Sequence, residues 1–172
     1  MPLVKNGQIA ADAFSHLDDE AEIPATGALL VPAARFLANA DALLQRVEPV
    51  GVIWPNNREI EELEPYLAKL AAVALVFPNF RDGRAYSQAR LLRERYKFRS
   101  ELRAVGQVLR DQFVFMLRAG FDTFEVRKQS DAEAFASTAR RYTVFYQPTG
   151  DGRITALHRR MQQRHAEESA NT

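Results

Sequence analysis

The chain has 172 residues, of which 47% are hydrophobic and 26% charged, and its formal net charge at pH 7 is +1. This composition is typical of one globular domain that buries a proper core. The absence of cysteine excludes disulfides, thiolate chemistry and cysteine-held zinc or iron–sulfur clusters, and no apolar run is long enough to span a membrane.

The charged residues are unevenly divided along the chain. Residues 1–80 hold 5 basic and 11 acidic side chains, whereas residues 81–172 hold 18 basic and 11 acidic ones. This asymmetry predicts a basic face suited to anionic ligands or an acidic partner, although arginine-rich helices also occur as simple solvated faces. The first residues lack the apolar segment of a signal peptide, so we expect a cytoplasmic protein without a membrane anchor.

Residues 1–26 are expected to form an irregular lead-in to the domain. Asn6-Gly7 is a tight-turn signal between the apolar positions Leu3-Val4 and Ile9, which allows a small hairpin there. From Gly27 onward, short apolar runs alternate with helical patterns. The runs that predict strands cover residues 28–31, 50–54, 72–77, 102–105, 123–126 and 143–146. The periodic stretches that predict helices cover residues 32–44, 58–70, 86–96, 108–119 and 131–140, the last capped by Ser130.

This alternation predicts an α/β fold for residues 1–152, with a mostly parallel sheet of about six βα units. We favour an incomplete, TIM-barrel-like sheet in sequential order, because consecutive units repeat one strand–loop–helix pattern without a long reversal. A doubly wound three-layer α/β sheet is the alternative. Residues 153–172 are expected to form a basic C-terminal tail, a short helix that ends in disorder.

The chain is organised around residues 77–111, FPNFRDGRAYSQARLLRERYKFRSELRAVGQVLRD. They begin at the carboxyl end of a predicted strand, the edge where ligands of parallel sheets bind. There Asp82, Gly83 and Arg84 lead into a helix, and exposed backbone N–H groups with a guanidinium favour phosphate, sulfate, sulfite or a carboxylate. Arg110 and Asp111 follow the next strand and are expected to converge on this place. The competing interpretation is a turn with a helix cap.

Nine positions of this segment are the candidate anion- or partner-binding residues: Asp82, Gly83, Arg84, Tyr86, Ser87, Arg90, Arg93, Arg110 and Asp111. Between residues 81 and 110, eight arginines and one lysine stand against three acidic residues, a balance of +6. Such a surface suits an acidic protein partner, and nucleic acid ranks last because no nucleic-acid-binding signature accompanies it.

No catalytic, metal-binding or cofactor-binding pattern can be assigned. Walker A, GxGxxG and HExxH spacings are all absent from the sequence. Asp82, Asp111 and Glu125 follow successive strands and could bind Mg²⁺, but capping and ion pairing are commoner roles for such residues.

The segment 77–111 closely resembles the hallmark block of a bacterial family of unknown function, whose members are commonly labelled probable oxidoreductases of sulfite reduction. The similarity extends to Val31-Pro32, Gly51-Val52 and Gly120-Phe121-Asp122. The family usually has threonine where Arg81 stands and glycine where Ala85 stands, so Arg81 is not carried over as a family ligand.

This resemblance implies a place in assimilatory sulfur metabolism beside sulfite reductase, without implying any catalytic residue. Because the chain lacks cysteine and a dinucleotide fingerprint, we expect an accessory protein that docks on sulfite reductase, or another sulfur-assimilation enzyme, or binds an oxyanion through residues 81–110. The alternative is a small α/β enzyme, an oxidoreductase or another class, with its site at the carboxyl ends of the strands.

Overall fold

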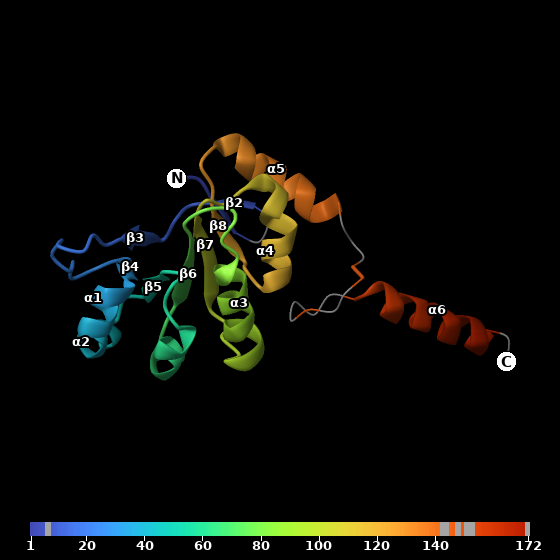
Figure 1. Ribbon diagram of the computed structural model, residues 1–172, viewed down its shortest axis with the longest axis horizontal. Helices are drawn as coiled ribbons and strands as arrows, with labels where there is room; N and C mark the ends of the chain where they lie inside the picture. Colours follow the sequence, from blue (N-terminus) through green and yellow to red (C-terminus); the bar gives the residue numbers. More distant parts are fainter. Residues whose placement is uncertain (6–7, 142–144, 147–148, 150–153, 171–172) are drawn as a thin grey trace.

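The computed structural model describes residues 1–5, 8–141, 145–146, 149 and 154–170. Eight strands form one sheet in the spatial order β2-β1-β8-β7-β6-β5-β4-β3 (Figure 1). Their bounds are Leu3–Lys5 (β1), Gln8–Ala10 (β2), Phe14–His16 (β3), Ala28–Pro32 (β4), Val50–Trp54 (β5), Ala72–Phe77 (β6), Glu101–Gly106 (β7) and Thr123–Glu125 (β8).

The strands β3 to β8 are parallel and follow one another in chain order, whereas β1 and β2 add an antiparallel hairpin beyond β8. The sheet curls into a half-barrel, so that His16 on β3 reaches Glu125 on β8, five strand positions away. This arrangement confirms the α/β prediction and the incomplete-barrel form of it.

The helices follow the strands in chain order and lie outside the curled sheet (Figure 1). This placement is expected, because right-handed crossovers in a sequential parallel sheet all fall on one face. The α-helices are Ala33–Ala38 (α1), Ala40–Leu44 (α2), Arg84–Arg90 (α3), Phe113–Ala119 (α4), Gln129–Arg141 (α5) and Ala156–Ala170 (α6). The shorter helical turns are the 3₁₀ segments Ile60–Tyr66 (η1) and Arg110–Gln112 (η3) and the π segment Leu91–Arg95 (η2).

Two hydrophobic clusters hold the sheet from its two faces. The larger lies under the helices and includes Trp54, Phe77 and Phe113, all fully buried. The smaller lies on the inner face of the curl, where the buried side chains are Leu30, Ala72, Ala74 and Val105. Small inner side chains let the strands curl tightly: a Cβ added at Gly51 would lie 2.7 Å from Leu30 Cδ2 and 2.8 Å from Ala72 Cβ.

Several predicted elements differ in detail from the structure. The lead-in holds three short strands: β1 and β2 form the hairpin expected around residues 6–7, which lie outside the described residues, and β3 was not expected. The stretch predicted as a helix over 58–70 is the shorter 3₁₀ segment η1, and Pro65 inside it cannot donate an α-helical hydrogen bond. The strand expected at 143–146 lies largely outside the described residues.

The C-terminal helix α6 extends away from the body of the molecule (Figure 1). It begins after an isolated parallel bridge between Phe145 and Thr155. Among the described residues, no helix combines the length and apolar character needed to cross a bilayer.

Candidate functional site

The loop after β6 pairs its own charges. Arg84 donates from Nε to Asp82 Oδ1 at 3.0 Å and from Nη2 to Asp82 Oδ2 at 2.6 Å, while its backbone N–H also faces Oδ1. The Arg84 guanidinium holds the pKa of the Asp82 carboxyl well below its usual range. Gly83 stands immediately before α3. Asp82 and Arg84 therefore bond to each other at the start of α3, as in the turn-and-cap interpretation.

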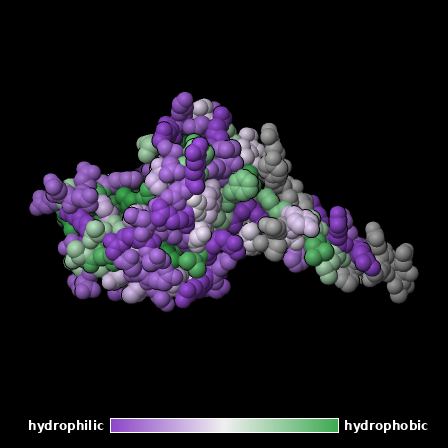
Figure 2. Space-filling model, in the orientation of Figure 1, coloured by the Kyte–Doolittle hydropathy of each residue, from purple (hydrophilic) through white to green (hydrophobic). Residues whose placement is uncertain are grey.

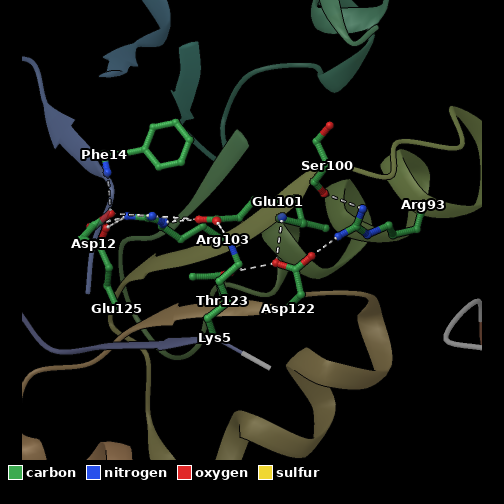
Figure 3. A network of polar contacts seen from close by, with 11 residues as sticks. Lys5, Asp12, Phe14, Arg93, Ser100, Glu101, Arg103, Asp122, Thr123 and Glu125 are labelled. Carbon is green, nitrogen blue, oxygen red and sulfur yellow. Dashed lines mark hydrogen bonds and ion pairs between the residues drawn. The ribbon is translucent and has the colours of Figure 1, made fainter. Parts of the chain in front are cut away.

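Arg93 is used inside the fold. Its guanidinium donates to the Ser100 backbone oxygen at 2.9 Å and to Asp122 Oδ2 at 2.7 Å (Figure 3). It also donates to the backbone oxygens of Phe98 at 2.6 Å and Gly120 at 3.0 Å. Only 12% of the Arg93 side chain is exposed, and burial lowers the pKa of its guanidinium. This side chain ties η2 to the starts of β7 and β8 and presents no cation to a partner.

Arg110 does not converge on the loop after β6. Its Nη2 donates to the Ser130 backbone oxygen at 3.3 Å, and its Nε lies 3.6 Å from Asp131 Oδ1 at the start of α5. Arg84 and Arg110 therefore face different carboxylates.

The other predicted residues line two adjoining hollows on the outer surface. One hollow, of about 510 Å³ between α3 and α4, is lined in part by Tyr86, Arg90, Asp111, Phe115 and Arg118. The second, of about 520 Å³ along α3 and η2, includes Ser87 and shares Arg90 with the first. Burial, with Asp111 nearby, raises the pKa of the Tyr86 hydroxyl to about 12.

Six of these residues come from neighbouring helical segments and line one continuous area. We call them the α3–α4 surface (Tyr86, Ser87, Arg90, Asp111, Phe115 and Arg118). Hydrophobic residues are exposed over α4, on a face that is otherwise mostly hydrophilic (Figure 2). Phe115 is the most exposed of the aromatic side chains on this surface, at 68%.

A second polar cluster, which the sequence interpretation did not identify, lies inside the half-barrel (Figure 3). At its centre is Arg103 on β7, which is fully buried. Its guanidinium binds Asp12 through Nη1 at 2.7 Å and Nη2 at 2.9 Å, Glu101 through Nε at 2.9 Å, and Glu125 through Nη1 at 3.0 Å. Lys5 binds the other oxygen of Glu101 at 2.7 Å. We call this group the lumen cluster (Lys5, Asp12, His16, Glu101, Arg103 and Glu125).

Strand register explains why these charges meet. Lys5, Thr123 and Arg103 stand opposite one another on β1, β8 and β7, so their side chains share the inner face of the sheet. A sequence signal for the cluster does exist, because Arg103 and Glu125 each stand between apolar neighbours within a predicted buried strand. A charged residue in that setting needs a buried partner. The sequence does not, however, identify which residues are those partners.

His16 joins the lumen cluster from β3. Its Nε2 lies 2.9 Å from Glu125 Oε1, and this hydrogen bond raises the pKa of the His16 imidazole against the opposing effect of burial. Burial favours a high pKa for Glu125, but the bonds from His16 and Arg103 outweigh it and lower that pKa. The imidazole is still 44% exposed at the rim of the lumen.

Asp12, His16 and Glu125 are also the set of described residues whose ligand atoms, within 4.8 Å of one another, could surround a metal ion. Nη1 of Arg103 already bridges the carboxylates of Asp12 and Glu125, at 2.7 and 3.0 Å. A divalent cation would stand beside that guanidinium, and like charges at such a distance repel. The donor set therefore fits a buried guanidinium better than a metal ion.

Comparison with known proteins gives one family. The family model described as "Bacterial protein of unknown function (DUF934)" matches residues 51–157, from β5 into α6. No curated protein matches the sequence. The matched range includes the α3–α4 surface, Arg103 and Glu125, whereas Lys5, Asp12 and His16 precede it.

Proposed function

The chain belongs to the bacterial family of unknown function DUF934, and we propose that it is an accessory protein of assimilatory sulfite reduction. In this proposal it docks on sulfite reductase, or on another enzyme of sulfur assimilation, through the α3–α4 surface. The link to sulfite reduction comes from the resemblance of residues 77–111 to members labelled in that way. The docking role comes from the geometry of the surface.

One observation carries the docking role: an exposed aromatic ring beside two arginines. Phe115 is 68% exposed and lines the same hollow as Arg90 and Arg118. An exposed aromatic ring that shares a hollow with arginines is a composition typical of protein interfaces, where tryptophan, tyrosine, phenylalanine and arginine are enriched. A hollow next to the ring provides room for a side chain of the partner.

The charges of the segment favour docking over capture of a small oxyanion. Arg93 is bonded inside the fold, and Arg84 and Arg110 pair with Asp82 and Asp131, whose side chains are only 18% and 20% exposed. Arg90 makes only an exposed pair with Glu94 at 3.2 Å, and Arg95 reaches Glu61 at 3.6 Å. Exposed pairs of this kind contribute little and exchange readily, so both arginines can turn to carboxylates on a partner. The partner surface is therefore expected to be acidic around an apolar centre.

The same contacts bear on the alternative, a small enzyme at the strand ends. That alternative needs Asp82, Arg84 and Arg110 to act on one bound molecule. Asp82 bonds to Arg84, and Arg110 faces Asp131, so the pairs point to turn and cap roles rather than to a shared reaction centre.

Titration of the full-length protein with purified sulfite reductase tests the proposal. Phe115→Ala is expected to weaken association about tenfold or more. Loss of an interface anchor that contributes about 1.4 kcal/mol or more raises the dissociation constant by that factor. Arg90→Glu is also expected to weaken association. Its effect should be larger at low salt than at high salt, because salt screens interactions between charges. The matched controls are Val47→Ala, because Val47 is fully exposed elsewhere, and Lys69→Glu, an exposed lysine before β6.

Both controls should retain wild-type affinity. Equal affinity of Phe115→Ala, Arg90→Glu and the wild type would remove the α3–α4 surface from the proposal. Absence of any association with sulfite reductase and with other sulfur-assimilation enzymes would remove the docking role itself.

A further inference from the structure

The lumen cluster contains three carboxylates bound to one guanidinium, and the three are not equivalent. Glu101 and Glu125 project from strands β7 and β8, which are held in the middle of the sheet. Asp12 lies in the linker 11–13, between the three-residue strands β2 and β3 at opposite edges of the sheet. Its side chain is 29% exposed, against 7% for Glu101 and 5% for Glu125. Asp12 is the carboxylate that can move into solvent without disturbing a central strand.

Arg103 holds Asp12 in the geometry of anion recognition. Its two terminal nitrogens donate to the two oxygens of Asp12, at 2.7 Å from Nη1 to Oδ2 and 2.9 Å from Nη2 to Oδ1. Parallel bonds from a planar guanidinium to a planar carboxylate are the arrangement with which proteins bind carboxylate ligands. The ring of Phe14 lies 5.5 Å from this guanidinium and forms an apolar wall beside it.

We propose that the terminal nitrogens of Arg103 form an anion site in which Asp12 is the resident occupant, and that a small external carboxylate displaces it. The ligand would be a monocarboxylate with a short apolar group, because Phe14 and the partly buried Ile53 and Val76 line the same inner face. Displacement frees the linker 11–13 from Arg103. This site is separate from the α3–α4 surface and does not depend on the proposed docking role.

Charge balance supports replacement rather than addition. When Asp12 leaves, Arg103 and Lys5 face only Glu101 and Glu125, and His16 can add a positive charge. The two Arg103 bonds that Asp12 accepts would then be unmade, and leaving buried N–H donors of a charged group without an acceptor is costly, so the vacated position favours an incoming monoanion. A second anion beside Asp12 would instead meet an unfavourable negative charge.

Hydrogen exchange in the wild-type protein tests displacement directly. The Phe14 backbone N–H donates to Asp12 Oδ1 at 2.9 Å, so this amide reports on the position of Asp12. Saturation with acetate, compared with chloride at equal ionic strength, is expected to speed exchange at Phe14 by about tenfold or more. Amides in β5 and β6 should keep their exchange rates.

Thermal unfolding with the same two salts tests the anion site itself. Asp12→Ala should be stabilised saturably by acetate and not by chloride, because a bound ligand shifts the unfolding equilibrium. Asp82→Ala is the matched control: it also removes an aspartate bonded twice by an arginine, but the Arg84 side chain is 58% exposed, so acetate should have no specific effect.

Two results overturn the proposal. If acetate stabilises Asp12→Ala while the wild-type Phe14 amide stays protected at every concentration, Asp12 is a fixed structural partner and not a displaceable one. If neither measurement responds to acetate, Arg103 is no anion site. The exchange measurement needs no variant, so it remains decisive even if Asp12→Ala fails to fold.

Discussion

Asp12 and Arg103 stand 91 positions apart in the sequence, yet the carboxylate of one accepts two hydrogen bonds from the guanidinium of the other. Arg103 belongs to the middle of the parallel sheet, whereas Asp12 belongs to the linker that runs from one edge of the sheet to the other. Their contact therefore holds the linker against the inner face of the half-barrel. The hydrogen bond between His16 and Glu125 likewise links β3 to β8 across the half-barrel.

Arg103→Met should be strongly destabilising. The side chain is 1% exposed, and its removal leaves Asp12, Glu101 and Glu125 without their shared cation. Breaking a buried pair by removing one partner costs about 3–5 kcal/mol. Chemical denaturation checks this, with Arg84→Met as the matched control, since Arg84 loses only an exposed pair. A small effect of Arg103→Met would mean that water replaces the guanidinium inside the sheet.

Stability should fall as pH rises through neutrality, because of His16. The folded-state pKa of His16 is raised above 6.5 by its hydrogen bond to Glu125. The stabilisation by the protonated ring is thus fully present below about pH 6.5 and is lost as pH rises through the folded-state pKa. The pKa values of Asp12 and Glu125 are lowered, so both stay ionised over this window.

His16→Gln isolates this effect, because the amide can still donate to Glu125 but carries no charge. The difference in unfolding free energy between wild type and variant, measured from about pH 5.5 to 9, should shrink with rising pH and amount to less than about 1 kcal/mol for a half-exposed ring. A difference that does not change with pH would show that His16 is neutral in the folded protein.

Gly51→Ala should destabilise the curl of the sheet. The new Cβ would lie 2.7 Å from Leu30 Cδ2, 2.8 Å from Ala72 Cβ and 2.9 Å from the Ala72 backbone oxygen. Overpacking of this kind costs about 1–3 kcal/mol. Gly83→Ala is the control, because the nearest atom there is Tyr86 Cδ2 at 3.8 Å, and its change should stay within about 0.5 kcal/mol. Equal melting temperatures of the two variants would show that the strands can move apart.

Arg93→Lys should lower stability by about 1–3 kcal/mol, since one ammonium cannot replace four guanidinium bonds directed to separate oxygens. Association with sulfite reductase should stay unchanged once the variant is folded, because the Arg93 side chain is only 12% exposed and lies off the α3–α4 surface. Weaker association at a temperature where the variant is fully folded would return Arg93 to the docking site.

The parallel part of the fold could be predicted because its strands are continuous apolar runs with clear ends. Val50–Trp54 and Ala72–Phe77 are each followed by proline, and each is buried from both sides. By contrast β3 reads Phe14-Ser15-His16, with no apolar run, and forms only because β4 offers an open edge. Its strand character depends on tertiary pairing and not on local propensity.

The candidate site could be predicted only where contacts are local. Asp82 and Arg84 are two positions apart, so the turn-and-cap interpretation was available from the sequence. The exposure of Phe115 was not predictable. Helical spacing assigns Leu109, Phe113, Met116 and Leu117 to the inner face of that helix, but it does not show whether another element covers Phe115. The lumen cluster joins residues from β1, β3, β7, β8 and a linker. Sequence periodicity does not show which residues far apart in the chain come into contact.

Growth of a deletion strain tests the central claim most directly. A strain that lacks this gene is expected to grow with cysteine as its sulfur source but poorly with sulfate or sulfite, and the wild-type gene and Val47→Ala should restore growth. Phe115→Ala and Arg90→Glu, produced at equal levels, should restore it poorly. Equal growth of the deletion strain on sulfite and on cysteine would contradict a role in sulfite reduction.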